Sequence, residues 1–128
     1  MGSRSIPDQI KRFVLTSLRS VPHLEALLLL RTTADMRWSP QEAARRLYVS
    51  AALAAEVLSD LRDAGFLAAD PEAEDCFRYQ PSTGELKGMV DQLAAVYARD
   101  LIALTELIHA RGRMKEQQFA DAFLLRND

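Results

Sequence analysis

Apolar residues recur at intervals of three and four over most of this chain, which is the spacing of one face of an α-helix. The first such pattern follows Pro7 and Asp8, and the second follows Ser20 and Pro22. A proline or an acid in the first turn, or a serine just before it, is a signal of a helix start. The pattern therefore predicts N-terminal helices within residues 5–34, the second of them buried on most sides.

The strongest local signal is the segment Ser39-Pro40-Gln41-Glu42. Its serine hydroxyl can accept a hydrogen bond from the N–H of Glu42, and the Glu42 carboxylate can accept one from the N–H of Ser39; this reciprocal pair is a capping box. We expect a helix over residues 40–48. Ser50 can cap the next helix, and Gly65 can end it, because glycine accepts the left-handed backbone found at many helix ends.

Two short segments after this helix pair have the alternation of strands. Phe66 to Ala68 is followed by a loop at 70–74 and then by Phe77 to Tyr79. Together they predict a β-hairpin. Met36-Arg37-Trp38, which precedes the capping box, could add one more strand to a small sheet.

The longest helical pattern occupies residues 82–110. Ser82 and Glu85 stand at the spacing of a capping box near its start. Residues 115–125 are then expected to form a last short amphipathic helix, with phenylalanines on its apolar face. That face either docks back onto the other terminal helices or serves as a linear motif for a partner.

This order of elements resembles the winged helix-turn-helix of bacterial transcriptional regulators. The resemblance is carried by ten positions between Ser39 and Leu67, namely Ser39, Glu42, Ala44, Leu47, Val49, Ser50, Leu53, Leu61, Gly65 and Leu67. With its terminal helices, the whole chain resembles the MarR type or its PadR-like relatives. The resemblance implies a single domain over 1–128, mainly α with a small β-hairpin, with the winged helix-turn-helix at 36–80. It also implies a homodimer held by the terminal helices, including a long dimerisation helix at 82–110.

Tyr48 departs from that pattern, because many such turns have glycine at this position. A left-handed backbone would cost a tyrosine about 1 kcal/mol or more. We therefore expect this turn to have a different shape. We also expect Tyr48, like Trp38, to belong to the core rather than to a ligand cage.

The resemblance implies that the helix at 50–64 lies in the major groove of DNA. Its outward face lacks the side chains that make bidentate base contacts, since it consists of Ser50, Ala51, Ala52, Ala55, Glu56 and Ser59. The hairpin region at 68–80 holds four acids against one arginine, so it would repel phosphates. The remaining DNA-binding candidates are Arg37, Arg45, Arg46 and Arg62 toward phosphates, and Ser50 and Ser59 toward bases.

The net charge and its distribution along the chain are compatible with two functions. The net charge of −2 argues against a generally basic nucleic-acid binder, although the first 46 residues are net positive and the rest are net negative. One hypothesis is a dimeric, transcriptional-regulator-like protein that binds DNA through the helix at 50–64 with weak base readout. The alternative is a winged helix repurposed as a protein–protein interaction module, without DNA binding, for a partner with a basic patch. The arginines would then only solubilise the surface or pair with Glu42 and Asp63.

The long helix offers a candidate dimer interface. Its apolar stripe extends over about three heptads and consists of Leu86, Val90, Leu93, Tyr97, Leu101, Leu104 and Ile108. The alternative is that this stripe packs on the first helix of the same chain.

A small-molecule effector is also compatible with the resemblance, since proteins of this type often bind effectors between the dimer helices and the winged domain. Phe13, Trp38, Tyr97 and Leu101 could line such a pocket, or they could be plain core. Nothing in the sequence identifies a ligand.

We expect no enzyme activity, no bound metal and no cofactor. The chain contains no recognisable catalytic set, and neither His23 nor His109 has a second ligand three or four residues away. Neighbouring acids should raise the pKa of Cys76, which disfavours an activated nucleophile but leaves a redox sensor open. The longest apolar run, Ala26 to Leu30, is too short for a membrane span, so we expect a cytoplasmic protein without a membrane partner.

Overall fold

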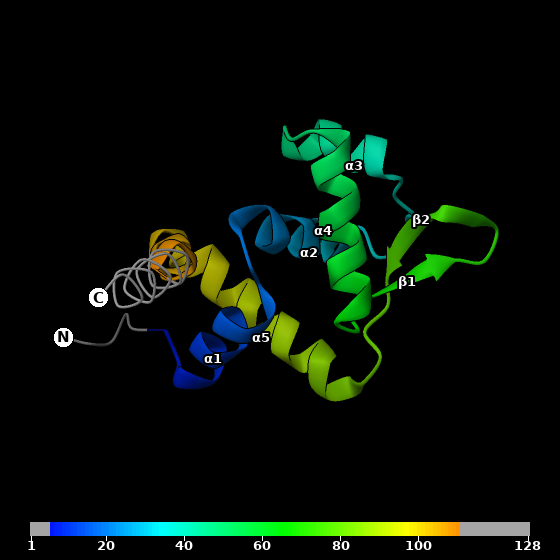
Figure 1. The fold of residues 1–128 in the computed structure, drawn as a ribbon. Helices are drawn as coiled ribbons and strands as arrows, with labels where there is room; N and C mark the ends of the chain where they lie inside the picture. Colours follow the sequence, from blue (N-terminus) through cyan, green and yellow to red (C-terminus); the bar gives the residue numbers. More distant parts are fainter. Residues whose placement is uncertain (1–5, 111–128) are drawn as a thin grey trace, which may run out of the picture.

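The computed structural model describes residues 6–110 and is mainly helical, with a small two-stranded antiparallel sheet (Figure 1). The elements in chain order are α1 (Asp8–Ser17), α2 (Val21–Thr32), α3 (Pro40–Leu47), α4 (Ala51–Asp63), β1 (Leu67–Asp70), β2 (Ala73–Tyr79), α5 (Gly84–Arg99) and an unlabelled helix, Leu101–Ala110. The expected mix of helices with a small hairpin is confirmed. The short helix expected at 115–125 lies outside the described residues.

The helix starts follow the capping signals of the sequence. The Ser39 hydroxyl accepts from the N–H of Glu42 at 3.2 Å, and the Glu42 carboxylate accepts from the N–H of Ser39 at 3.0 Å, so the expected capping box is confirmed. Ser50 likewise caps α4 by accepting from the N–H of Leu53 at 3.1 Å. At α5, however, the cap is Thr83 rather than the expected Ser82.

The turn between α3 and α4 keeps the left-handed residue that glycine usually supplies. Tyr48 has φ 58° and ψ 44°, and its N–H donates to the carbonyl of Ala44. The N–H of Val49 donates to the same carbonyl, and α4 begins two residues later. Our expectation of a differently shaped turn was therefore wrong: Tyr48 adopts the strained conformation.

The hairpin begins directly after α4 and is tied to the segment before α3. Gly65, with φ 95°, turns the chain out of α4 into β1. Leu67 pairs with Tyr79 and Ala69 with Phe77 in an antiparallel register. Phe77 also forms a two-hydrogen-bond bridge with Trp38, both bonds 2.8 Å long. The strand expected around Trp38 is thus a single bridge.

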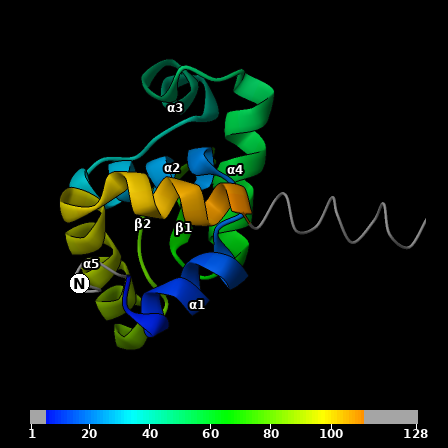
Figure 2. The same cartoon turned by 90° about the vertical axis from the view of Figure 1, so that its left-hand side faces the viewer.

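The core gathers around α2, which contacts α3, α4 and β2 (Figures 1 and 2). Most of its leucines are buried, as the sequence predicted. Arg31 of α2 donates to the Asp91 carboxylate of α5 at 3.0 Å, which joins the central helix to the C-terminal ones. Within residues 6–110 no single helix has the length and hydropathy of a membrane span; only α1 and α2 together, bent by 108°, meet that test.

The expected continuous helix at 82–110 is interrupted at Asp100. This residue has φ −147° and ψ 61°, and its carbonyl accepts from the N–H of Leu104 at 3.3 Å, so it ends α5 and starts the next helix. Figure 2 shows that Leu101–Ala110 runs across the direction of α5. The prediction was wrong because the three-and-four spacing of apolar residues continues through Asp100. The helices on both sides of Asp100 bury residues at this spacing, so the spacing alone does not reveal the break.

Candidate nucleic-acid interface and adjacent pocket

The first turn of α4 is uncovered by the rest of the described chain. Ser50, Ala51 and Ala52 are exposed, whereas Ser59, further along the helix, is half-buried. The opposite side of α4 packs on α2, α3 and β1. Of the two serines expected to touch bases, Ser50 already accepts one hydrogen bond to cap the helix, which leaves its hydroxyl proton and one lone pair for a ligand.

The four candidate arginines divide into two groups. Arg37 and Arg62 lie beside the hairpin: Arg37 is 3.7 Å from Asp70, next to the hairpin turn, and Arg62 pairs with Asp63 at 3.0 Å. The Arg62 guanidinium also lies 5.9 Å from the centre of the Phe77 ring. The pairing of Arg62 with Asp63 that we considered from the sequence is confirmed, and it reduces what this arginine offers to a phosphate.

The other two arginines lie in the last turn of α3. The Arg46 guanidinium is 5.7 Å from the centre of the Trp38 ring, a cation–π geometry. Arg45 is exposed and forms no ion pair with any residue in the described range 6–110. Hydrogen bonds from Ser39, and to a smaller extent the charge of Arg45, lower the pKa of Glu42, so Arg45 is exposed but lies within the field of that carboxylate.

The hairpin is less uniformly acidic at its surface than its composition indicates. Asp70 is buried, and its carboxylate accepts from the N–H of Glu72 at 2.8 Å and from Arg78 at 3.3 Å. The Glu72 N–H lowers the pKa of Asp70 most, and Arg78 and Arg37 lower it further, against the opposing effect of burial. Glu72 and Asp75 remain exposed. One of the hairpin acids is thus an internal structural anion.

The two aromatic residues beside α3 have opposite environments. Trp38 is 5% exposed, and its indole N–H donates to the Thr33 hydroxyl at 2.9 Å, so the expectation of a core residue is confirmed. Tyr48 is 94% exposed, so the same expectation for Tyr48 was wrong. The left-handed turn projects its ring into solvent rather than onto α3.

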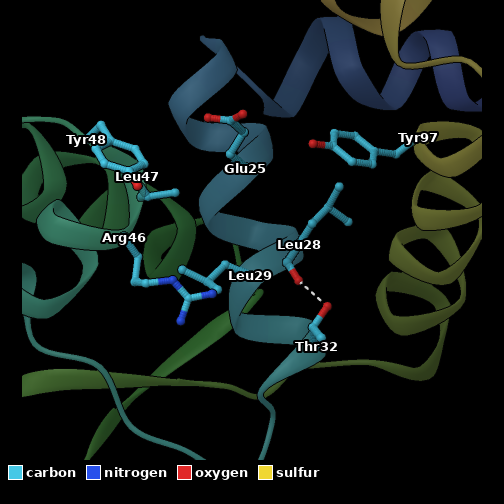
Figure 3. Close-up of a pocket in the computed structure, with 8 residues that line it drawn as sticks. All are labelled: Glu25, Leu28, Leu29, Thr32, Arg46, Leu47, Tyr48 and Tyr97. Carbon is cyan, nitrogen blue, oxygen red and sulfur yellow. Dashed lines mark hydrogen bonds between the residues drawn. The ribbon is translucent and has the colours of Figure 1, made fainter.

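A pocket of about 430 Å³ lies against α2, between the end of α3 and α5 (Figure 3). It is lined by Glu25, Leu28, Leu29, Thr32, Arg46, Leu47, Tyr48 and Tyr97. Of the residues that we expected around an effector, only Tyr97 lines it. Phe13 packs edge-on against Phe66 with ring centres 5.5 Å apart, and it lines a separate pocket of about 490 Å³ beside α1. Trp38 is buried, and Leu101 is 44% exposed.

Most of the candidate dimer stripe is used inside the chain. Val90, Leu93, Leu104 and Ile108 are buried within the single copy, and Leu86 and Tyr97 are half-buried. Val90, Leu93, Leu104 and Ile108 therefore pack inside the chain, the alternative that we left open, and are corrected as dimer contacts. For the half-buried Leu86 and Tyr97 a dimer contact stays a prediction. The apolar side chains that do reach the surface here are Leu101 and Ile102, the latter 70% exposed.

His23 forms a connection that the sequence did not reveal. It is buried on α2, where its Nδ1 lies 2.6 Å from the Ser20 hydroxyl and its Nε2 lies 2.9 Å from a carboxylate oxygen of Asp60 on α4. The partners are 37 residues apart in the sequence, so no local pattern could have found them. The histidine fixes α4 against α2.

The described residues give little support for a metal site or for a reactive cysteine. Among residues 6–110 no group of three histidine, cysteine or acidic side chains could hold a metal ion. Burial, and then the charge of Asp75, raises the pKa of the half-buried Cys76 thiol, so it is less reactive than a free cysteine.

No family model, curated protein or solved structure matches this chain significantly.

Proposed function

We propose that this chain is a winged-helix protein that binds duplex DNA as a homodimer, with α4 in the major groove. The observation that carries the proposal is the uncovered first turn of α4, which follows α3 through a left-handed turn and precedes a hairpin. In a helix-turn-helix the start of the second helix is the part that meets base edges. The opposite side of α4 packs on α2, α3 and β1, which sets the position of α4 in the fold.

The charges support binding that depends more on phosphates and DNA shape than on bases. Arg45 is exposed and forms no ion pair within residues 6–110, and burial of Asp70 beneath two arginines removes one repulsive charge from the hairpin surface. The exposed start of α4 carries a serine and alanines, which make few specific hydrogen bonds to bases. We therefore expect a modest preference among sequences and a strong dependence of affinity on salt.

The proposed dimer uses the surface around Leu101 and Ile102. These are the large hydrophobic side chains that Leu101–Ala110 leaves exposed. Two copies joined through this helix would present their α4 helices to successive major grooves, about 34 Å apart.

The test is a fluorescence anisotropy titration of labelled duplex pools, of random and of genomic sequence, at low salt. We expect half-saturation at micromolar protein or below, and weaker binding by Arg45→Gln. Arg12→Gln, the same change on the exposed side of α1, is the matched control and should bind as the parent chain does. No binding at about 10 μM dimer would overturn the proposal, since non-specific DNA affinity alone reaches that range.

A second candidate, a protein-interaction module, is favoured by the exposed acids. Glu56 on α4 and Glu72 and Asp75 on the hairpin form no ion pairs with other residues of the described range 6–110. A basic partner would fit this surface. In the same titration, failure with DNA together with saturable, salt-sensitive binding of a labelled oligolysine would favour this second function.

A further inference from the structure

Tyr48 combines two features that packing does not explain. Among the described residues it is the one non-glycine residue with positive φ, at 58°. An L-residue with a bulky side chain pays about 1 kcal/mol or more for that conformation. Its ring is 94% exposed, so burial of the ring does not offset the strain.

The fold requires the left-handed backbone here but not the phenol. The N–H groups of Tyr48 and Val49 both donate to the Ala44 carbonyl, which closes α3 and lets Ser50 start α4. Glycine or asparagine supplies the same backbone at lower cost. Strain that persists at an exposed side chain points to a use for that side chain.

The charged side chains near Tyr48 are of both signs: Glu25 and Arg46 line the same pocket, and the exposed Arg45 is the cation available to an anionic partner. Arg45 precedes Tyr48 by three residues and is exposed without an ion pair in the described range, whereas the Arg46 guanidinium lies over Trp38. Figure 3 shows Tyr48 at the edge of the pocket, across from Tyr97. Arg45 in the last turn of α3 and Tyr48 in the turn before α4 supply an exposed guanidinium and a phenol hydroxyl, the kinds of donor from which a sugar–phosphate backbone accepts hydrogen bonds.

We propose that Tyr48 is a DNA-backbone contact: its hydroxyl donates to a phosphate oxygen at the edge of the groove that α4 enters, and Arg45 neutralises a neighbouring phosphate. The inference rests on the proposed function and deepens it, because it names a contact outside α4 itself. The contact fixes the position of α4 on the duplex and carries no base preference.

The experiment compares the full-length chain with Tyr48→Phe, Tyr48→Gly and Arg45→Gln by fluorescence anisotropy on one duplex of about 20 base pairs at several KCl concentrations. Tyr48→Phe removes the hydroxyl and keeps the ring, and it should weaken binding about tenfold. The slope of log affinity against log salt should not change, because no charge is lost. Arg45→Gln should instead reduce that slope by about 1.

Tyr48→Gly separates binding from folding. It should weaken binding at least as much as Tyr48→Phe, while the thermal unfolding midpoint rises because the left-handed strain is removed. Tyr97→Phe, which removes the hydroxyl from the tyrosine on the other side of the pocket, is the matched control and should leave DNA affinity unchanged.

Four other results of these measurements would each overturn a different part of the proposals. Parent-like DNA affinity in both Tyr48 variants would overturn the contact and leave the proposed function standing. A loss with Tyr48→Gly but not with Tyr48→Phe would overturn the hydroxyl contact in favour of ring packing. If the parent chain binds no DNA, both proposals fail. Reduced self-association in sedimentation, with unchanged DNA affinity, would make Tyr48 a protein contact instead.

Discussion

Single residues in this molecule hold distant elements together through polar groups that are largely withdrawn from water. The Asp70 carboxylate accepts a hydrogen bond from the Glu72 N–H and pairs with two arginines at the hairpin. His23 joins the start of α2 to Asp60 of α4. A buried polar group whose partners are removed costs more free energy than its hydrogen bonds contribute when intact. Loss of either group should therefore affect the hairpin or α4 as a whole.

Asp70→Asn should lower the thermal unfolding midpoint at neutral pH, because the arginines lose the carboxylate that they surround. The pKa of Asp70 is lowered in the folded state from its ordinary value of 3.8. Its carboxylate therefore contributes stability fully above pH 3.8, and the contribution is lost as the pH falls through the folded-state pKa. Calorimetric scans should show the two proteins converging in that acidic range. Equal midpoints at pH 7 would contradict this account; Asp63→Asn, at an exposed pair, is the control.

His23→Ala should destabilise the fold by about 2 kcal/mol, because it leaves a cavity and removes the hydrogen-bond partner of Asp60, which keeps only its longer ion pair with Arg19 at 3.8 Å. Urea unfolding followed by circular dichroism measures the change. His109→Ala, at an exposed position, should shift the midpoint little. A similar small shift for both variants would show that His23 does not hold α4 against α2.

At the scale of elements, helix starts are local features, and Ser39 illustrates this. Ser39→Ala removes one half of the capping box and leaves an N–H of α3 without its acceptor. We expect a loss of about 1 kcal/mol in the free energy of unfolding. Ser59→Ala, inside α4, should be close to neutral. Equal effects of the two serine substitutions in urea titrations would contradict the capping role.

The same local character explains which elements the sequence could predict. The caps at Ser39 and Ser50, the turn at Gly65 and the hairpin depend on residues a few positions apart, and each appears in the structure. The break at Asp100 was missed because a single non-helical residue does not disturb the three-and-four spacing of the leucines around it.

The candidate site was less predictable than the fold. The sequence indicated the start of α4 and the arginines near it, but the direction of each side chain depends on partners elsewhere in the chain. The Arg46 guanidinium lies over the Trp38 ring. Arg62 forms an ion pair with Asp63, and Arg37 forms one with Asp70. Tyr48 was expected in the core rather than in a ligand cage, but its left-handed backbone at the turn accompanies a ring that is exposed to solvent.

At the scale of the whole molecule, the surface around Leu101 and Ile102 is the proposed contact between two copies. Ile102→Asp should convert a dimer at tens of micromolar into a 14 kDa species in sedimentation velocity. Its unfolding midpoint under dilute conditions should change little, because the side chain is exposed in the single copy. Met36→Asp, at another exposed hydrophobic residue, controls for the added charge. A parent chain that sediments as a monomer would contradict the proposed dimer.

The junction at Asp100 has a consequence for any assembly built on the helix after it. Because α5 and Leu101–Ala110 meet at one residue, the backbone angles there determine how the rest of each copy is oriented relative to a shared C-terminal contact. In the proposed dimer, a change at Asp100 would alter the preferred number of base pairs between half-sites while every group that touches DNA stays the same.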